Sequence, residues 1–393
     1  MGTGRTHGLH HTVGDRAIGD RTVDDSMVAR LVDDASAAPS MHNTQPWRFR
    51  YLRAERTFQL RADLTRVMPH HDPELRALHM ACGAALLNLR VAVAEEGLAV
   101  MTTLLPDPAD EELLASVRLE RPTGGGGGPL SDARAAGRAA AGGDPRGSAP
   151  AATGAGSGTG TESETGAGSD DLALLHPFVH IRNSSRFPFE ETPIPAAVQV
   201  ALAEASRCEG VDLAFPAGWH LDLVLDLIRT GEERYRADEG ARADRAAWTR
   251  TETPGGDGGA PQDGVPRYAF GPRERGGRVP GPDYESDTGA PLPVRDTATF
   301  ERDPHLVLLS TPRDGAHDWL RAGQAMERVL LLAARSGLAS SFLTQAVEWP
   351  DLRWPLRDPV SGRGNVQMVL RIGYGPHGPS TPRRAAGDVL DFE

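Results

Sequence analysis

The chain is poor in cysteine, which excludes two common ways of stabilising a small protein. Only Cys82 and Cys208 occur among 393 residues. Two cysteines can form neither a disulfide framework nor a cysteine-rich zinc site. We expect both to lie in helices as small apolar side chains.

The chain also lacks positive net charge and long apolar runs. Its formal net charge is −12, which argues against a general binder of nucleic acid or acidic membranes. Any anion site must therefore be a local cluster of arginines. The N-terminus has no apolar run of signal-peptide length, and we expect no stretch long enough to span a bilayer. A cytoplasmic protein is the expectation.

Two segments lack the apolar residues that a core requires. Residues 1–22 are polar; their three histidines, His7, His10 and His11, could bind a metal, but a disordered tail is the favoured interpretation. Residues 123–170 hold 15 of the 45 glycines. They cannot bury enough surface to offset their ordering entropy, so a flexible linker is predicted. The glycine run at 154–160 has neither a strand before it nor a helix after it, which excludes a Rossmann loop.

Elsewhere the hydrophobic spacing predicts alternating helices and strands. In the first part we expect a helix between Ser26 and Pro39, a hairpin at 47–52 and 58–64, a helix at 72–98 and a strand at 100–105. In the second part we expect helices at 195–207, 219–237 and 319–338, and strands at 211–215, 305–310, 341–344 and 366–372.

Residues 252–298 form a predicted irregular insertion. They are rich in glycine and proline but contain Tyr268, Phe270 and Tyr284. Aromatic side chains in an irregular segment suggest a loop that packs on the protein, so a lid-like role is expected.

A repeat relates the two parts at a constant offset of 240 residues. Gly83 aligns with Gly323 and Gly97 with Gly337, and apolar residues between them also match. Two buried helices could match this well by chance, but the coincident glycines favour duplication. We therefore predict two related halves, residues 23–122 and 171–393.

The most specific string runs from Pro39 to Trp47, between a predicted helix and a predicted strand. Its prolines fix a turn, and Ser40, Asn43 and Gln45 add hydroxyl and amide groups that could contact a flat polar ligand such as a flavin ring. The alternative is an ordinary capping turn with Trp47 in the core. That alternative does not explain the density of amides.

Two further strings contain arginine pairs. Arg182 and Arg186 flank Ser184 within a few residues, and Arg383 and Arg384 follow the last predicted strand. Arginine forks match phosphate oxygens, so either pair could bind an anion. Such pairs are also common on solvated surfaces. The run His70-His71-Asp72 shows no third ligand, and we reject a metal there because Asp72 is a plausible helix cap.

Together these strings resemble the nitroreductase superfamily, and most closely its actinobacterial Acg-like branch of FMN-binding proteins. The string at 39–47 is close to the PSxxNxQPW segment that lines the flavin ring in that family, and 182–186 matches its RxSxR phosphate clamp. The family also approaches flavin N5 with main chain that maps to 341–345. The implied FMN-binding residues are Pro39, Ser40, Met41, Asn43, Gln45, Arg182, Ser184, Arg186, Leu343, Thr344, Gln345, Arg383 and Arg384.

The resemblance implies an α+β fold whose flavins lie at a dimer interface. Here the ring segment lies in the first half and the phosphate clamp in the second. We therefore expect an internally duplicated, monomeric chain that resembles a nitroreductase dimer and keeps one FMN site.

Two functions follow from the resemblance. One is an enzyme in which FMN takes hydride from NADH or NADPH at N5 and reduces a nitroaromatic or quinone-like acceptor. No side chain can be named as a proton donor. The alternative is a protein that sequesters FMN in a closed pocket beneath 252–298. Neither function involves nucleic acid or membrane.

Overall fold

The computed structural model describes residues 23–120, 161–163, 171–250, 262–280, 295–360 and 362–393. The predicted tail at 1–22 and most of the predicted linker at 123–170 lie outside the described residues, as does Tyr284. Within that linker, β5 (Thr161–Ser163) pairs antiparallel with β3 (Ala99–Leu104). This short part of it thus has regular backbone structure.

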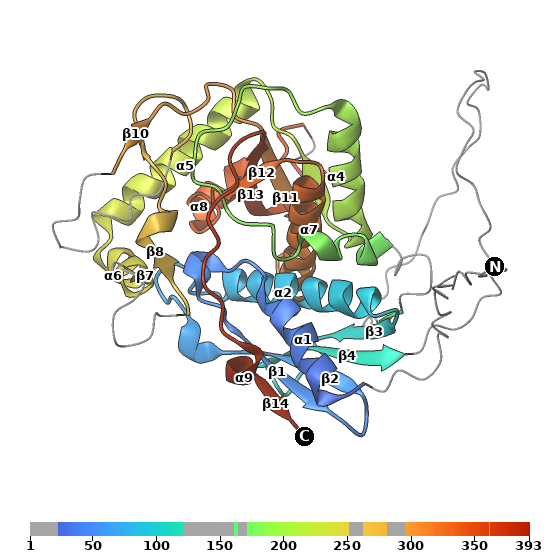
Figure 1. Cartoon of the computed structure of the whole chain (residues 1–393). Coiled ribbons are helices and arrows are strands. Elements are labelled where there is room, and N and C mark those ends of the chain that lie inside the picture. The colour runs from blue at the N-terminus through green and yellow to red at the C-terminus, as the bar shows by residue number, and fades with distance from the viewer. Residues whose placement is uncertain (1–22, 121–160, 164–170, 251–261, 281–294, 361) are drawn as a thin grey trace, which may run out of the picture.

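The first half consists of helices packed on a sheet, which lies at the bottom of Figure 1. The apolar spacing of the first predicted helix is buried as expected, with Val28, Leu31 and Val32 in the core. The elements are α1 (Asp25–Ser36), η1 (Met41–Asn43), β1 (Trp47–Leu52), β2 (Thr57–Ala62), η2 (Leu64–Arg66), α2 (Arg76–Glu95), β3 and β4 (Leu113–Glu120).

The second half lies above it in Figure 1 and has a second sheet. Its main elements are α4 (Ala196–Cys208), β6 (Asp212–Ala214), α5 (Trp219–Ala237), α6 (Glu239–Ala247), β11 (Leu306–Thr311), α7 (Ala316–Arg335), β12 (Ala339–Phe342) and β13 (Asn365–Gly373). Short elements connect them: η3 (His176–Phe178), β7 (Thr249–Arg250), β8 (Val265–Pro266), η4 (Arg267–Ala269), β9 (Arg273–Glu274), β10 (Thr297–Ala298), α8 (Pro350–Arg353) and η5 (Trp354–Leu356).

The two sheets share one strand order. The first contains β1-β2-β4-β3 and the second β6-β11-β13-β12, with neighbours antiparallel throughout both series. In each, one long helix, α2 or α7, joins the second strand to the third. Gly97 and Gly337 end these helices with φ of 72° and 74°, a conformation that favours glycine. Glycines related by the 240-residue offset therefore have the same backbone conformation. A common origin of the two halves stays a prediction.

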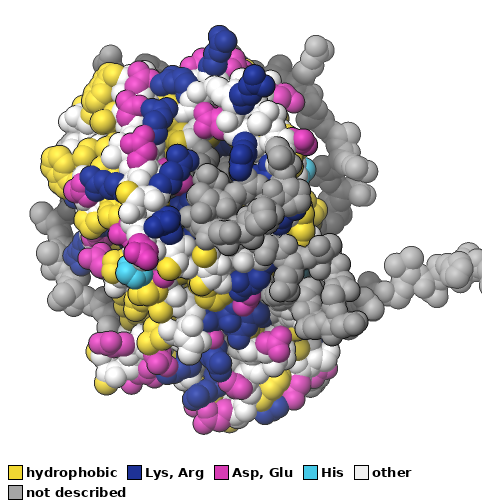
Figure 2. Space-filling view, turned by 90° about the vertical axis from the view of Figure 1, so that its left-hand side faces the viewer, with side chains coloured by type: hydrophobic (Ala, Val, Ile, Leu, Met, Phe, Trp, Pro, Cys, Tyr) yellow, Lys and Arg dark blue, Asp and Glu magenta, His cyan; other side chains and the backbone are white. Residues whose placement is uncertain are grey.

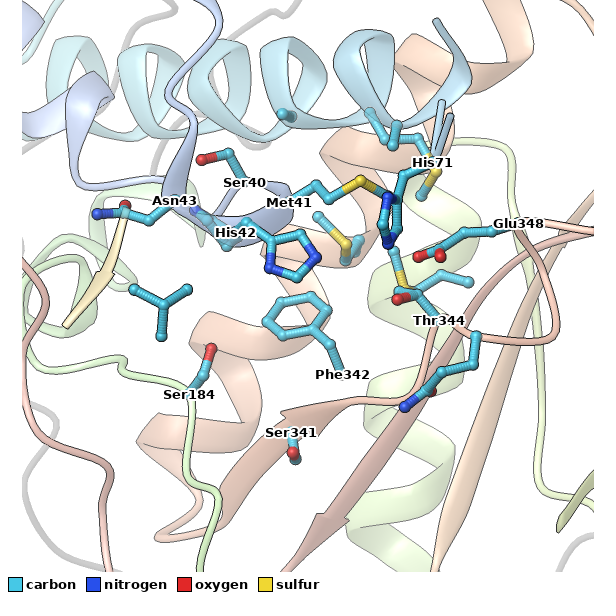
Figure 3. A pocket seen from close by; sticks show the side chains of 18 of the residues that line it. Ser40, Met41, His42, Asn43, His71, Ser184, Ser341, Phe342, Thr344 and Glu348 are labelled. Atoms are coloured by element: carbon cyan, nitrogen blue, oxygen red, sulfur yellow. The ribbon is translucent and has the colours of Figure 1, made fainter. Parts of the chain in front are cut away.

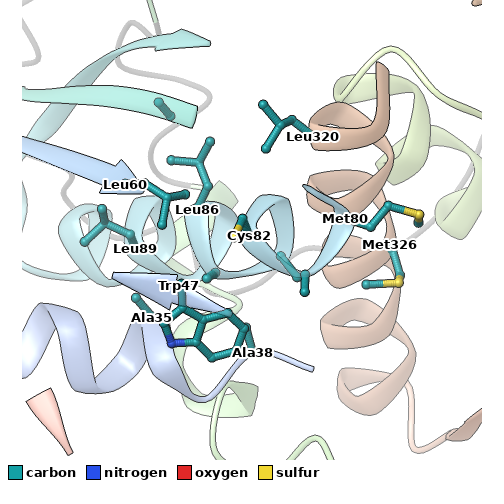
Figure 4. Packing of buried hydrophobic residues seen from close by; sticks show 14 of the residues in the cluster. Ala35, Ala38, Trp47, Leu60, Met80, Cys82, Leu86, Leu89, Leu320 and Met326 are labelled. Carbon is teal, nitrogen blue, oxygen red and sulfur yellow. The ribbon is translucent and has the colours of Figure 1, made fainter. Parts of the chain in front are cut away.

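The long helices α2 and α7 cross at the centre of the molecule, where the aligned glycines meet. A Cβ atom at Gly83 would lie 2.2 Å from the carbonyl oxygen of Leu320, and one at Gly323 would lie 2.0 Å from that of Met80. The two contacts are equivalent, because the 240-residue offset that aligns Gly83 with Gly323 also aligns Met80 with Leu320. Figure 4 shows Met80 of α2 beside Met326 of α7, in the core cluster that also contains Leu320. The close approach excludes any side chain at either glycine.

The C-terminal segment crosses from the second half to the first. After β13 it passes through α9 (Ala386–Val389) and ends in β14 (Leu390–Phe392), which pairs parallel with β1 (Figure 1). The Ala386 N–H donates to Asp33 Oδ1 of α1 at 2.7 Å. The second half thereby completes the sheet of the first.

Two expectations from composition need adjustment. Contrary to the sequence expectation, α2 is long and apolar enough to cross a membrane, but 89% of that stretch is buried inside the protein, as in a core helix. Cys82 is buried in α2 as expected, whereas Cys208, the last residue of α4, is exposed. On the face seen in Figure 2, arginine side chains lie among acidic ones.

Candidate functional site

A cavity of about 150 Å³ lies between the halves. Figure 3 shows Ser40, Met41, His42, Asn43 and His71 of the first half on one side of it, and Ser184, Ser341, Phe342 and Thr344 of the second half on the other. Ten of the thirteen residues implied by the resemblance line it: Pro39, Ser40, Met41, Asn43, Arg182, Ser184, Arg186, Thr344, Gln345 and Arg383. Folding thus brings four segments that are distant in sequence to one cavity.

The other three implied residues do not line the cavity. Gln45 is fully buried behind its wall, where its Nε2 donates to the Gln262 carbonyl and its Oε1 accepts from the Arg384 N–H. Leu343 lies in the apolar core, and Arg384 lies 3.6 Å from Asp63. Gln45, Leu343 and Arg384 therefore support the cavity wall from behind through these contacts.

The backbone of the 39–47 string takes an uncommon path. His42, Asn43 and Gln45 all have positive φ, at 45°, 58° and 51°. Such conformations cost free energy for residues other than glycine and persist only where the surroundings fix them. Here the Ser40 hydroxyl accepts from the Gln45 N–H at 2.9 Å. Trp47 is fully buried.

The amide of Asn43 holds three segments together. Its Nδ2 donates to the carbonyl oxygens of Gly264 and Pro382, both at 3.0 Å, and its Oδ1 accepts from Arg383 Nη1 at 3.0 Å. Both donor hydrogens are thus used within the protein. The density of amides that suggested ligand contacts in the sequence instead joins the turn to the insertion and to the C-terminal segment.

One end of the cavity has more positive charge than its carboxylates balance. Arg182 Nη2 and Arg383 Nη2 both donate to the Ala37 carbonyl, at 3.2 and 3.3 Å. Arg182 also pairs with the buried carboxylate of Glu327 at 3.2 Å. Burial and the nearby charge of Arg182 lower the pKa of Arg383 to about 9. A bound anion would offset this repulsion.

Unsatisfied donors lie at the same end. Arg182 Nη1 and Arg383 Nε are buried without a hydrogen-bond partner among the described residues. Buried donors of this kind are rare unless a ligand or water satisfies them. Ser184 lines the cavity too, and Arg186 donates to the Ala269 carbonyl at 2.9 Å. The donor set suits a phosphate.

The centre of the cavity is apolar. Met80, Met326, Met368 and Phe342 line it, and methionine and aromatic side chains adapt well to a flat aromatic face. The buried Oε1 of Gln345 has no hydrogen-bond partner among the described residues, so the wall also offers an acceptor. Phosphate donors, an apolar centre and this acceptor fit a phosphorylated flavin.

The opposite end contains residues that sequence reasoning missed. His71 stacks on Tyr235 of α5 with ring centroids 4.4 Å apart, and the Tyr235 hydroxyl donates to Glu348. Arg245 of α6 pairs with Glu232 of α5 at 3.2 Å. These side chains come from four separate segments, and no local pattern joins them. Only the His70-His71-Asp72 run drew attention to this region.

The run His70-His71-Asp72 lies just before α2. No group of three potential ligands occurs among the described residues. Asp72 instead accepts from the N–H groups of Ala77 and Leu78, at 2.9 and 2.8 Å, in the first turn of α2. It caps the helix from outside, because α2 begins at Arg76 rather than at Asp72.

The described part of the predicted insertion packs on the cavity wall. Asp263 pairs with Arg66 and with Arg250, Gly264 bonds to Asn43, and Val265 lines the cavity. Phe270 is buried, and the half-exposed Tyr268 donates from its hydroxyl to the Ser380 carbonyl. These contacts place 262–270 against the 39–47 turn.

Comparisons with known proteins agree with the motifs. The chain is 26% identical over 378 residues to a Mycobacterium tuberculosis protein provisionally named NAD(P)H nitroreductase, covering 94% of this chain and 92% of that one. It is 25% identical over 383 residues to the protein of that organism provisionally named NAD(P)H nitroreductase Acg, covering 94% and 97%. A solved structure of a provisionally assigned nitroreductase from Anabaena variabilis matches with 10% identity and a TM-score of 0.39, covering 91% of this chain and 90% of that one. No family model matches.

Over more than nine-tenths of its length the chain is thus similar to Acg-like proteins provisionally named NAD(P)H nitroreductases. The α+β class predicted from the sequence is confirmed by the mixed helices and sheets.

Proposed function

We propose that the cavity binds one FMN and that the protein is an NAD(P)H-dependent oxidoreductase of nitroreductase type. The observation that carries the proposal is the buried pair Arg182 and Arg383, whose unsatisfied donors border an apolar cavity. The curated relatives provisionally named NAD(P)H nitroreductases support the activity. When bound, FMN supplies acceptance and transfer of hydride.

In this proposal the chain's own residues bind and orient the cofactor. The phosphate is held through charge-assisted hydrogen bonds from four residues, Arg182, Ser184, Arg186 and Arg383. The apolar centre around Phe342 and the methionines contacts the ring. The 262–270 segment limits the access of water from the side of the 39–47 turn.

We further propose that the chain corresponds to a nitroreductase dimer fused into one polypeptide. Three observations support this. The two sheets share one strand order, the helices meet reciprocally at Gly83 and Gly323, and β14 crosses from the second half to pair with β1. The phosphate donors of the second half meet the ring segment of the first in one cavity. One FMN per chain and a monomer are the expected consequences.

A second candidate function is storage of FMN without turnover. The packing of 262–270 against the 39–47 turn favours it, because this segment could keep a nicotinamide from the ring. The enzyme remains our main proposal. Acceptors of quinone or nitroaromatic type are proposed from the family resemblance.

A visible spectrum of the purified protein, before and after NADPH, tests both candidates. We expect a yellow protein that releases about one FMN per chain on denaturation and is bleached by NADPH within minutes. Dithionite is the control, because a small reductant reaches the ring in either case. Bleaching by dithionite alone would favour storage. A colourless protein that fails to bind added FMN would refute the cofactor assignment.

A further inference from the structure

A buried histidine faces the cavity away from the phosphate donors. In Figure 3, His71 and Glu348 lie on the side opposite to Asn43 and Ser184. His71 is 3% exposed and lines the cavity. Its Nε2 has no hydrogen-bond partner among the described residues. A buried imidazole with an unsatisfied nitrogen beside a cavity suggests a group that serves a ligand.

The ring of His71 is held in a fixed orientation. It stacks on Tyr235 with an interplanar angle of 8° and meets the His42 ring edge-on at 5.5 Å. Its Nδ1 lies 3.6 Å from Asp244 Oδ2. That carboxylate is itself fixed, because it accepts from the backbone N–H groups of His70 at 2.7 Å and His71 at 3.2 Å. A carboxylate beside one imidazole nitrogen fixes the orientation of the ring.

Other ionisable groups at this end are less suited to release a proton. Burial, followed by the charges of His71, Arg245 and Arg186, lowers the pKa of His42 well below its usual range, so it is neutral. The Tyr235 hydroxyl already donates to Glu348. Burial first and the charge of Glu348 second raise the pKa of that hydroxyl.

Reduction of a quinone-like acceptor requires such a proton. A quinone becomes a hydroquinone by taking up two electrons and two protons, whereas NAD(P)H provides two electrons and one proton as hydride. The second proton must come from the protein or from water. A positioned imidazole typically accelerates such a transfer by 10²–10⁴-fold.

We propose that His71, oriented by Asp244, donates this proton to an oxygen of a quinone-like acceptor bound in the cavity. An N–H bond of the imidazolium breaks, an O–H bond forms on the acceptor, and the neutral ring regains a proton from water beside Asp244. The overall change is quinone plus NAD(P)H plus one proton to hydroquinone plus NAD(P)⁺. The inference rests on the proposed oxidoreductase function and adds the proton donor that the sequence did not reveal.

The test compares two electron acceptors on the intact, FMN-loaded protein reduced by NADPH. 1,4-Benzoquinone needs protons, whereas ferricyanide accepts single electrons and needs none. We expect His71→Gln to slow oxidation by benzoquinone about a hundredfold, with ferricyanide oxidation changed less than about twofold. His70→Gln is the matched control, because the neighbouring His70 side chain is exposed and outside the cavity.

Asp244→Asn provides a second variant that can still accept the two backbone hydrogen bonds. We expect it to shift the pH profile of benzoquinone reduction and leave ferricyanide reduction unchanged. The titratable groups facing His71 are Asp244 of α6, His42 of η1 and Tyr235 of α5, with Arg245 and Glu348 close by. FMN content and melting temperature, measured for each variant, show whether the fold is retained.

Equal slowing of both acceptors in His71→Gln would overturn the proposal, because it would indicate a structural or electron-transfer role. Unchanged benzoquinone reduction would overturn it as well. Should His71→Gln fail to fold, an unchanged pH profile in Asp244→Asn would count against the proposal. Failure of the underlying function is distinct, because the wild-type protein would then lack FMN or resist NADPH.

Discussion

Asn43 and Gly264 bind each other twice across 221 residues of sequence: the Asn43 side chain donates to the Gly264 carbonyl at 3.0 Å, and the Gly264 N–H donates to the Asn43 carbonyl at 3.2 Å. This exchange fixes the insertion on the turn that borders the cavity. The access of a ligand to the cavity on this side therefore depends on how strongly the 39–47 turn and the 262–270 segment bind each other.

The ionic anchor of the insertion gives the first prediction. Asp263 pairs with Arg66 and Arg250 outside the cavity. Asp263→Ala should loosen 262–270 and speed FMN release on dilution by about tenfold, as expected for about 1.4 kcal/mol of lost charge-assisted bonding at a partly exposed site. Release is followed by the rise of free-flavin fluorescence. Asp226→Ala, at an exposed pair on α5, is the control. Equal release rates in the two variants would mean that 262–270 does not retain the cofactor.

A second prediction concerns phosphate recognition by Arg383. Arg383→Gln removes one buried charge while Arg182 keeps its partner Glu327. FMN binding should weaken about thirtyfold, or about 2 kcal/mol for a lost charge-assisted contact. Riboflavin has no phosphate, so its affinity should change little. Fluorescence titration of both ligands measures the difference, and a parallel loss for both would show that Arg383 supports the wall instead.

Arg182 should behave differently because its carboxylate partner is fully buried. Arg182→Ala leaves Glu327, at 0% exposure, without its ion-pair partner. Breaking a buried pair typically costs about 3–5 kcal/mol, so the variant should lose stability as well as FMN. The double variant Arg182→Ala/Glu327→Gln should recover much of the stability but not the FMN affinity. Urea unfolding and flavin titration separate the two effects. Recovery of both in the double variant would contradict phosphate binding by Arg182.

The helix crossing gives a prediction about the fold. Gly323→Ala places a methyl group against the Met80 carbonyl and should destabilise the protein by about 2–3 kcal/mol, the upper part of the usual range for overpacking. Gly387→Ala is the matched control, since a Cβ there would contact nothing within 4 Å. Denaturant unfolding of both variants measures the difference. Because the cavity lies between the halves, FMN content should fall with Gly323→Ala alone.

A pH-dependent contact holds the segment before the phosphate clamp. His176 and His180 bond to the two oxygens of Asp34, at 2.9 and 2.7 Å. The bond to Asp34 raises the pKa of His180 against the effect of burial. Burial would raise the pKa of Asp34, but the bonds from His180 and then His176 outweigh it, and that pKa is lowered.

The sign of the pH effect follows from these shifts. A raised histidine pKa contributes stability below about 6.5 that is lost as the pH rises through the folded value, whereas the lowered aspartate pKa contributes above about 3.8. The contact should therefore be strongest between these values and weaken above neutrality. Melting temperatures at pH 6 and 8 should differ less in Asp34→Asn than in the wild type. An identical difference would show that the contact contributes nothing.

The sequence predicted elements whose pattern is local. The helix α5 was predicted at its observed bounds, and β1 and the glycine-ended helices followed from spacing and turn residues. The strand β4 and the helix α6 were missed, because β4 depends on pairing with β2 and β3 and α6 has few apolar residues. The three residues of β14 have structure only because they pair with β1.

The candidate site was likewise predicted only in part from the sequence. The arginine pairs and the 39–47 turn were found as strings, and folding brought Arg182, Arg186, Arg383 and residues 39–43 to one cavity. His71, Tyr235 and Glu348 were not found, because their proximity depends on how α5 packs against the first half. The amide of Asn43 was expected to face a ligand, but its hydrogen bonds lie within the protein. The sequence showed which groups are polar but not which partners they would meet.

The pairing of β14 with β1 affects the stage of protein synthesis at which the cofactor can bind. The strand follows every other described element, and Arg383 lies just before it. While a ribosome makes the chain, the first half emerges with the outer edge of β1 unpaired and without Arg383 beside Ala37. Domains commonly begin folding as they emerge, and open strand edges favour aggregation meanwhile. Closure of the first sheet and capture of a phosphate would thus occur together, late in synthesis, so that a half-made chain could not sequester the cofactor.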